Sequence, residues 1–203
     1  MKITVITADI IQSRAKGHAV ASLPEHLSEL KHSQLLAGFA MSRGDEIQGV
    51  LSGWLTAPEV IRLLRYTCRP LHLRVGIGLG VHEGRLERNP WDLTGPAFFG
   101  ARSALDDLKR SRRVKTKVVT GGANELDRLL NAIMLLLDTV EMNWTEAQWE
   151  ADHVYEARGT YAAAGDKLGV AAQNVHKRCQ AAHWNAVREA ENALRASAKL
   201  LSP

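Results

Sequence analysis

The sequence lacks the features that mark disulfide-stabilised, membrane-spanning or secreted proteins. It contains only two cysteines, Cys68 and Cys179, which excludes a disulfide framework and fits a reducing cytoplasm. Its longest apolar stretch, 132–137, is far shorter than the roughly 18 residues that suggest a transmembrane helix. The segment 1–11 alternates and is interrupted by Asp9, so it differs from a secretory signal. We therefore expect a cytoplasmic protein with no membrane partner.

The composition is that of a globular chain long enough for one large domain or two small ones. Apolar residues make up 45% of the 203 residues, and the formal net charge is +4. This charge permits a polyanionic partner without requiring one. The segment 109–117 carries six lysines and arginines, a pattern equally compatible with a solvated loop and with a contact to nucleic acid or nucleotide.

Hydrophobic periodicity predicts a mixed α and β organisation for the first part of the chain. The predicted strands are 2–8, 39–41, 47–51, 71–79 and 114–120, and the predicted helices are 23–36, 58–67 and 96–109. Along the chain, the first six of these elements follow the order strand, helix, strand, strand, helix, strand. This order predicts a ferredoxin-like sheet covered by two helices. A further helix and strand follow.

The pattern becomes entirely helical after the last predicted strand. From Glu125 onward, apolar residues recur at helical spacing as far as Leu137. The change in composition near Gly122 predicts a sheet domain over 1–122 and an all-α domain over 123–203. The predicted fold class is therefore α+β.

Two acidic residues are expected to lie together in the predicted sheet. Asp9 follows the first strand, and Asp45 lies in the turn of the central hairpin. Two adjacent carboxylates repel each other, and a hard divalent cation such as Mg²⁺ is the usual remedy. Taken singly, each residue also has a structural explanation, since Asp45 can make the turn and Asp9 can cap the next segment.

Four blocks in order resemble those of class III nucleotidyl cyclases. They are Thr-Ala-Asp-Ile at 7–10, Gly-Asp at 44–45, Leu-Arg-Val-Gly-Ile-Gly-Leu-Gly at 73–80, and Asp-Leu-Thr-Gly at 92–95 continuing to Ala-Arg at 101–102. The hairpin also resembles the GGDEF turn of diguanylate cyclases. With Ser-Arg at 13–14, Gly-Asp-Glu-Ile-Gln-Gly at 44–49 and Asn-Pro-Trp at 89–91, the region from about 2 to 120 resembles the SatD-like family more closely still.

The cyclase resemblance implies Mg²⁺ and ATP as ligands. It makes Asp9 and Asp45 the metal ligands, Asp92 the acceptor from the adenine amino group, and Arg102 the catalytic arginine delivered to the phosphates across a dimer interface. Exposed amides and a guanidinium suit phosphate oxygens. The implied triphosphate cradle consists of Ile10, Ile11, Gln12, Ser13 and Arg14.

Two departures from the cyclase pattern favour a nucleotide sensor over an active enzyme. Phe98 stands where the family has its transition-state asparagine, and Met41 stands where it has a lysine that reads adenine. Neither side chain can form the missing hydrogen bonds. Glu46 and Gln48 are candidates to support the metal ligands, although for Gln48 a strand position that faces solvent is favoured.

Residues 160–182 resemble a helix-turn-helix of the sigma-factor region 4 type. Gly169 would make the turn, the small Gly165 would let the helices approach, and the second helix would begin near Ala171. The predicted core of this segment is Leu168, Val170, Val175 and Cys179. The predicted DNA-contacting residues are Gln173, Asn174, His176, Lys177 and Arg178. A plain helical hairpin is the alternative.

Together these patterns predict a nucleotide-sensing transcription regulator. Its partners would be a purine nucleotide, double-stranded DNA and a second copy of the chain, because helix-turn-helix proteins normally read paired half-sites. An active nucleotidyl cyclase or nucleotidyltransferase with a helical accessory domain is the alternative. A protein-interaction adaptor is a third class, and it is disfavoured by Asp9, Asp45 and Asp92.

Overall fold

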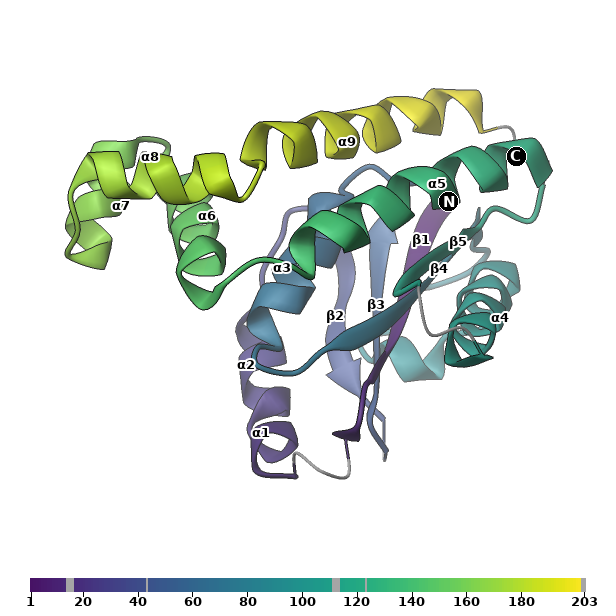
Figure 1. Cartoon of the computed structure of the whole chain (residues 1–203). Coiled ribbons are helices and arrows are strands. Elements are labelled where there is room, and N and C mark those ends of the chain that lie inside the picture. The colour runs from purple at the N-terminus through teal and green to yellow at the C-terminus, as the bar shows by residue number, and fades with distance from the viewer. Residues whose placement is uncertain (14–16, 43, 111–113, 123, 202–203) are drawn as a thin grey trace. The chain divides into compact units, whose positions relative to one another are not determined.

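The computed structural model describes residues 1–13, 17–42, 44–110, 114–122 and 124–201 (Figure 1). It contains one five-stranded mixed sheet and many helices, so the predicted mixture of α and β structure is confirmed. Contacts divide the chain into a sheet unit, 1–135 with 194–203, and a helical unit, 136–193. The boundary predicted near Gly122 precedes helix α5 (Asn124–Glu141), whereas this division falls within that helix.

The sheet has the strand order β2-β3-β1-β4-β5. Its strands are β1 (Lys2–Ile10), β2 (Leu35–Met41), β3 (Glu46–Ser52), β4 (Leu73–Val81) and β5 (Thr116–Val119). The central strand β1 is antiparallel to both β3 and β4, and β5 runs parallel to β4. In this register Asp9 lies opposite Glu46 on one side and Arg74 on the other. Directly opposed residues share one face of a sheet, so these three side chains start from the same face.

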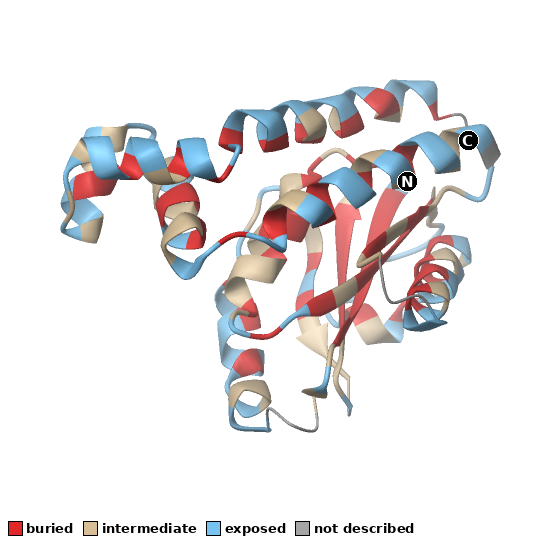
Figure 2. Ribbon diagram, viewed as in Figure 1, coloured by how far each residue is buried: buried red, intermediate tan, exposed pale blue. Residues whose placement is uncertain are grey.

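Helix α4 (Pro96–Arg110) packs on that face because β4 has glycines where the helix crosses it. A Cβ at Gly78 would lie 1.9 Å from the Ala97 carbonyl oxygen, and one at Gly76 would lie 2.2 Å from the Ala101 carbonyl oxygen. Only glycine permits so close an approach of two backbones. Ile3, Val5 and Phe98 belong to the buried cluster between helix and sheet. Figure 2 shows buried positions along the strands and on α4.

The opposite face of the sheet is covered by a second apolar layer. Helix α3 (Glu59–Thr67) buries Val60, Ile61 and Leu64, and Ile61 lines a small space together with Ile6 and Ile77 of the sheet. At the edge strand β5, the side chain of Asn131 in α5 accepts from the Val118 amide at 2.8 Å and donates to the Val118 carbonyl at 2.9 Å. An exposed strand edge is thereby satisfied by a side-chain amide.

The predicted helix over 23–36 is too long. The structure has two short helices, α1 (Gly17–Ala21) and α2 (Leu23–Glu29), and the chain is extended at Leu30 before β2 begins at Leu35. The leucines of this segment mimic helical spacing, but Leu30 and Leu35 lie beyond the helix. The helices predicted over 58–67 and 96–109 are confirmed to within one residue at each end.

The helical unit is built around α6 (Glu146–Arg158), α7 (Tyr161–Leu168) and α8 (Ala172–Ala181), which pack against one another, and includes most of α9 (Trp184–Ser197). Thr160 caps α7, and Gly169 ends it in the left-handed conformation with φ 65°. A Cβ at Gly165 would lie 2.6 Å from the Val170 carbonyl oxygen, so a larger residue would force the two helices apart. In the described part of the chain, none of the helices is long and apolar enough to cross a bilayer.

Two short 3-10 helices complete the described elements. The turn η2 (Pro90–Asp92) precedes α4, and η3 (Ala198–Leu200) follows α9. Arg195 at the end of α9 donates to Glu59 Oε2 at 2.7 Å and to the Thr56 carbonyl at 3.1 Å, and all three residues belong to the sheet unit. These bonds fasten the end of α9 to the beginning of α3.

Candidate functional site

A carboxylate cluster, consisting of Asp9, Asp45 and Glu46, lies where β1 ends and β3 begins. Asp9 is 7% exposed, and its Oδ2 accepts a hydrogen bond from Arg74 Nη1 at 2.8 Å. The other oxygen, Oδ1, is buried and has no hydrogen-bond partner in the structure. A buried carboxylate oxygen without a partner is costly and therefore calls for an explanation.

The surroundings of Asp9 raise the pKa of its carboxyl above the ordinary value. Burial raises the pKa of Asp9, and the charge of Asp45 raises it further. The charges of Arg74 and Lys109 lower the pKa, but they do not outweigh the burial. An added positive charge at the free oxygen would favour the ionised form.

Asp45 is half-buried in the hairpin turn and is held by the segment that follows β1. The Ser13 hydroxyl donates to Asp45 Oδ2 at 2.5 Å. The structure therefore brings the two predicted metal ligands near enough to interact electrostatically and places Ser13 beside one of them. Arg14 lies outside the described residues.

Glu46 draws two basic side chains of α4 towards the cluster. Lys109 Nζ donates to Glu46 Oε1 at 2.9 Å, and Arg102 Nη2 lies 3.6 Å from Glu46 Oε2. Burial lowers the pKa of Lys109, but the hydrogen bond and charge of Glu46 and the charge of Asp9 outweigh that effect and raise it. Arg102, the predicted catalytic arginine, thus contacts a carboxylate of its own chain. The sequence did not place Arg74 or Lys109 at this cluster, although Lys109 belongs to the basic segment 109–117 considered for a nucleotide contact.

The predicted triphosphate cradle is only partly open. The Ile10 side chain is buried and its backbone pairs with Leu73 in the sheet, while the Ile11 amide donates to the His72 carbonyl at 2.8 Å. The Ile11 amide is therefore already engaged and cannot donate to a phosphate in this conformation. Gln12 is exposed and adopts a positive φ of 59°, which turns the chain towards Ser13.

Gln48 does not face solvent, so that prediction is wrong. The side chain is 5% exposed, accepts from the Thr7 hydroxyl at 3.1 Å and donates to the Pro90 carbonyl at 2.7 Å. A buried amide that connects two strands and η2 fixes the position of the turn. Asp92, the predicted adenine contact, is exposed at the end of this turn.

The two positions that depart from the cyclase pattern differ in their surroundings. Phe98 is 7% exposed, belongs to the buried cluster between α4 and the sheet, and contacts the His82 ring edge-on. Met41 is half-buried at the end of β2. Phe98 therefore contributes to packing and adds no polar group to the carboxylate cluster.

The basic segment 109–117 includes the last two residues of α4, Lys109 and Arg110, and Lys117 of β5. Arg110 donates to Asp107 at 2.6 Å, and Lys117 also contacts Asp107, whereas Lys109 contacts Glu46. The pairs with Asp107 favour the solvated interpretation for Arg110 and Lys117, while Lys109 belongs to the surroundings of the carboxylate cluster. Residues 111–113 lie outside the described part.

In the helical unit, α8 has one buried and one exposed face. Val175 and Cys179 are buried, as predicted, whereas Leu168 and Val170 are only half-buried. Burial raises the pKa of the Cys179 thiol to about 11, so this thiol is inert at neutral pH. The exposed face carries four of the predicted DNA-contacting residues, Gln173, Asn174, His176 and Lys177, and Arg178 is half-buried beside them.

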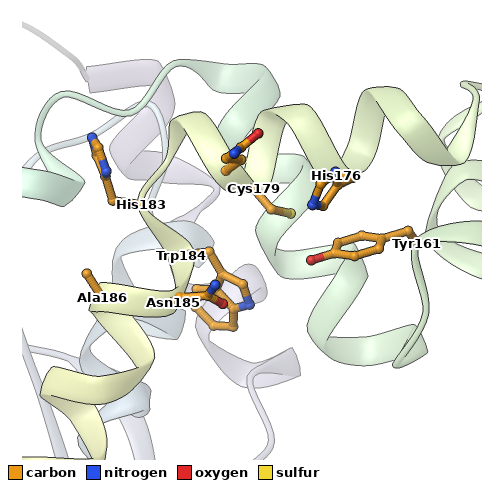
Figure 3. Close-up of a pocket in the computed structure, with 8 residues that line it drawn as sticks. Tyr161, His176, Cys179, His183, Trp184, Asn185 and Ala186 are labelled. Carbon is orange, nitrogen blue, oxygen red and sulfur yellow. The ribbon is translucent and has the colours of Figure 1, made fainter.

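An aromatic group and a hollow of about 320 Å³ lie next to this face. The rings of Tyr155 and Tyr161 stack with centroids 4.3 Å apart, and His176 meets Tyr161 edge-on at 5.0 Å. Figure 3 shows Tyr161, His176 and Cys179 on one side of the hollow, and Trp184 at the start of α9 on the other. His176 is therefore engaged with an aromatic ring, which the sequence pattern did not indicate.

Acidic and basic residues of the helical unit also pair with each other. Arg188 of α9 lies 3.9 Å from Glu156 and over the Trp184 ring at 5.4 Å. Part of its charge is therefore neutralised within the chain. In neither unit do three or more histidine, cysteine or acidic side chains gather as a metal site among the residues that the structure describes.

The comparison with known families covers nearly the whole chain. A model of the SatD family matches residues 3–186. The chain belongs to the SatD family. The matched range extends from β1 to the start of α9, so it covers the segments of this chain that carry the carboxylate cluster and the exposed face of α8. No curated protein and no solved structure matches the chain.

Proposed function

We propose that this member of the SatD family is a DNA-binding transcription regulator whose sheet unit binds Mg²⁺ and ATP. The observation that carries the nucleotide part is the buried, unpartnered Oδ1 of Asp9 beside a second carboxylate, Asp45. A buried carboxylate oxygen without a hydrogen-bond partner, with a second carboxylate nearby, is suited to a hard divalent cation. The proposal includes no catalytic turnover.

The residues present fit a magnesium ion bound jointly with a nucleotide. Mg²⁺ is usually held by one or two carboxylates together with phosphate oxygens and water, and Asp9 and Asp45 would supply the carboxylates. The Ser13 hydroxyl holds Asp45 in place and stands beside it as a further polar group. When bound, the ion would supply the charge that compensates both acids and would join them to the phosphates.

The sheet supports a cyclase-like interpretation of this site. The order β2-β3-β1-β4, with β1 antiparallel to both neighbours, is compatible with a ferredoxin-like arrangement of the palm type. Gln12 and Ser13 remain as open positions of the cradle, and Asp92 is exposed at η2. Phe98 packs in the core, which favours sensing over cyclisation because it cannot stabilise a phosphate or ribose oxygen.

The exposed face of α8 supports DNA binding. Gln173 and Asn174 have amides suited to adenine, while Lys177 and Arg178 suit guanine or phosphate. The short α7, the left-handed Gly169 and the tight contact at Gly165 are typical of a helix-turn-helix. Because such modules read paired half-sites, we infer that the chain acts as a homodimer in the cytoplasm.

Thermal unfolding with and without Mg²⁺ and ATP tests the nucleotide part. Wild-type protein should be stabilised by both ligands together, and Asp45→Asn should remove the effect, because an amide keeps the bond from Ser13 but loses the charge. Asp166→Asn, at an exposed position of α7, is the matched control and should behave as wild type. Absence of stabilisation in the wild type would reject the nucleotide proposal.

A further inference from the structure

Two cations of α4 converge on one carboxylate. Arg102 and Lys109 lie about two helical turns apart, on one face of the helix. Lys109 Nζ is 2.9 Å from Glu46 Oε1, and Arg102 Nη2 is 3.6 Å from Oε2, so each oxygen of Glu46 has its own basic neighbour. A phosphate group recognised by lysine and arginine would offer the same anionic oxygens.

The position of Glu46 explains why these cations lie at the cluster. Glu46 follows Asp45 in the chain and is opposite Asp9 in the sheet, so the three acidic residues belong to one turn and the strand ends next to it. Arg74 already contacts Asp9, whereas Lys109 contacts Glu46 and also interacts with the charge of Asp9. Lys109 is therefore the cation that interacts with both Glu46 and the predicted metal ligand Asp9.

The three ion-pairing side chains are exposed enough to exchange partners. The side chain of Lys109 is 37% exposed, that of Arg102 is 53% exposed and that of Glu46 is 23% exposed. Ion pairs of this exposure are weak, since water screens them. An incoming polyphosphate with several charges could therefore replace Glu46 as the partner of both cations.

We propose that Lys109 is a phosphate-binding residue of this site and that Glu46 is an internal anion, which holds Lys109 and Arg102 until a polyphosphate takes them over. This inference rests on the proposed nucleotide site and names a part of it. The ligand class is a magnesium-bound polyphosphate, and the base plays no part in the exchange. The buried Oδ1 of Asp9 is the independent sign that the cluster accepts a further cation.

The inference makes Glu46 a competitor of the ligand and not a metal ligand. Removing its charge should tighten binding, because the phosphates no longer displace a carboxylate from the two cations. Removing the charge of Lys109 should weaken binding. If Glu46 acts by holding Lys109, the gain from Glu46→Gln should also shrink when Lys109 is neutral, which is a coupling that independent charge effects do not give.

Isothermal titration calorimetry with Mg·ATP and with Mg·tripolyphosphate tests the inference. We expect Glu46→Gln to bind both probes about threefold more tightly, as expected for a weak surface ion pair. We expect Lys109→Gln to bind both about tenfold more weakly, and the double variant to show less than the threefold gain. Glu83→Gln and Lys31→Gln, at exposed positions of the sheet unit, are the matched controls.

The outcomes separate this inference from the proposed function. If wild-type protein binds Mg·ATP but Glu46→Gln binds it equally or more weakly, Glu46 is no competitor and the inference is rejected, while the nucleotide site stands. An undiminished gain in the Lys109→Gln background also rejects it. If neither wild type nor Glu46→Gln binds either probe, both proposals are rejected. Unfolding without ligand checks that each variant is folded.

Discussion

At the scale of single residues, Asp9 is a buried carboxylate that is unfavourable in the ligand-free protein and is also the proposed metal ligand. It is buried, its Oδ1 has no hydrogen-bond partner, and burial raises its pKa despite the nearby Arg74. A side chain that is unfavourable in the ligand-free protein is common at binding sites, because the compensation comes with the ligand. The same residue should therefore affect stability and binding in opposite directions.

We predict that Asp9→Asn leaves the melting temperature of the metal-free protein unchanged or higher and abolishes its stabilisation by Mg·ATP. A raised pKa means that the folded state binds the proton more tightly than the unfolded state. The stability that Asp9 contributes is therefore present at low pH and is lost as the pH rises through the folded pKa. Thermal scans across pH check this, and Asp9→Asn should lack that component. A clear loss of stability in Asp9→Asn would contradict the conclusion that the buried Asp9 carboxylate is unfavourable in the metal-free protein.

A second prediction at this scale concerns turnover. Incubation with ATP and Mg²⁺ should give no cyclic nucleotide, because Phe98 is part of the buried core and offers no polar atom to the site. Chromatography of the reaction products measures this directly. Robust formation of a cyclic product would replace the sensor by an active cyclase.

At the scale of elements, the β4 glycines determine where α4 lies and hence which side chains reach the cluster. Gly76 and Gly78 allow the helix backbone to touch the strand, and α4 then carries Arg102 and Lys109 to Glu46. The position of Arg102 and Lys109 therefore depends on the lack of side chains at Gly76 and Gly78 in β4. This connects a repeated glycine pattern to the electrostatics of the site.

We predict that Gly78→Ala destabilises the protein by about 2 kcal/mol or more, because an added methyl group would displace the helix. The new Cβ would lie 1.9 Å from the Ala97 carbonyl oxygen. Gly38→Ala in β2 is the matched control, since no atom outside its neighbours lies within 4 Å of a Cβ there. Denaturant unfolding compares the two variants. Equal stabilities would show that α4 does not depend on the glycine contact.

For the helical unit, we predict that Lys177→Ala and Arg178→Ala weaken DNA binding and leave Mg·ATP binding unchanged. Each loses a cation beside the exposed face of α8, and the loss should reduce the dependence of DNA affinity on salt. Lys199→Ala, outside the helical unit, serves as the control. Anisotropy titrations with labelled duplex measure the effect. Unchanged DNA affinity in both variants would remove α8 as the reading helix.

At this scale, the sequence predicted correctly those elements that are determined by the local spacing of apolar residues. Local spacing of apolar residues predicts the strand β1, the helices 58–67 and 96–109 and the burial of Val175 and Cys179. The helix predicted over 23–36 failed because its leucines satisfy helical spacing while the chain extends at Leu30.

The site was predictable only in part, for the same reason. Asp9 and Asp45 could be paired because sheet topology places strand ends together. The cations beside these acids could not be predicted in this way. Arg74 lies opposite Asp9 because β1 pairs with β4, and Lys109 contacts Glu46 because of how α4 packs. The burial of Gln48 depends on η2, a turn far away in the sequence. Long-range contacts of this kind leave no local pattern.

At the scale of the whole molecule, the proposed regulator would combine a nucleotide-binding sheet unit and a DNA-reading helical unit in one chain. If the two sites are coupled, ATP must change DNA affinity and DNA must change ATP affinity by the same factor. A ligand that binds one dimer geometry better would supply this coupling by setting the spacing of the two reading helices. Both effects concern equilibrium affinities and can be measured separately.

The most direct test is an anisotropy titration, at fixed salt, of a labelled duplex that the protein has selected from a random pool. The titration is run with and without Mg·ATP, and calorimetry establishes ATP binding in the same buffer. The account predicts binding curves displaced by about fivefold or more, with the displacement absent in Asp45→Asn. Curves that superimpose while ATP binds would contradict the account.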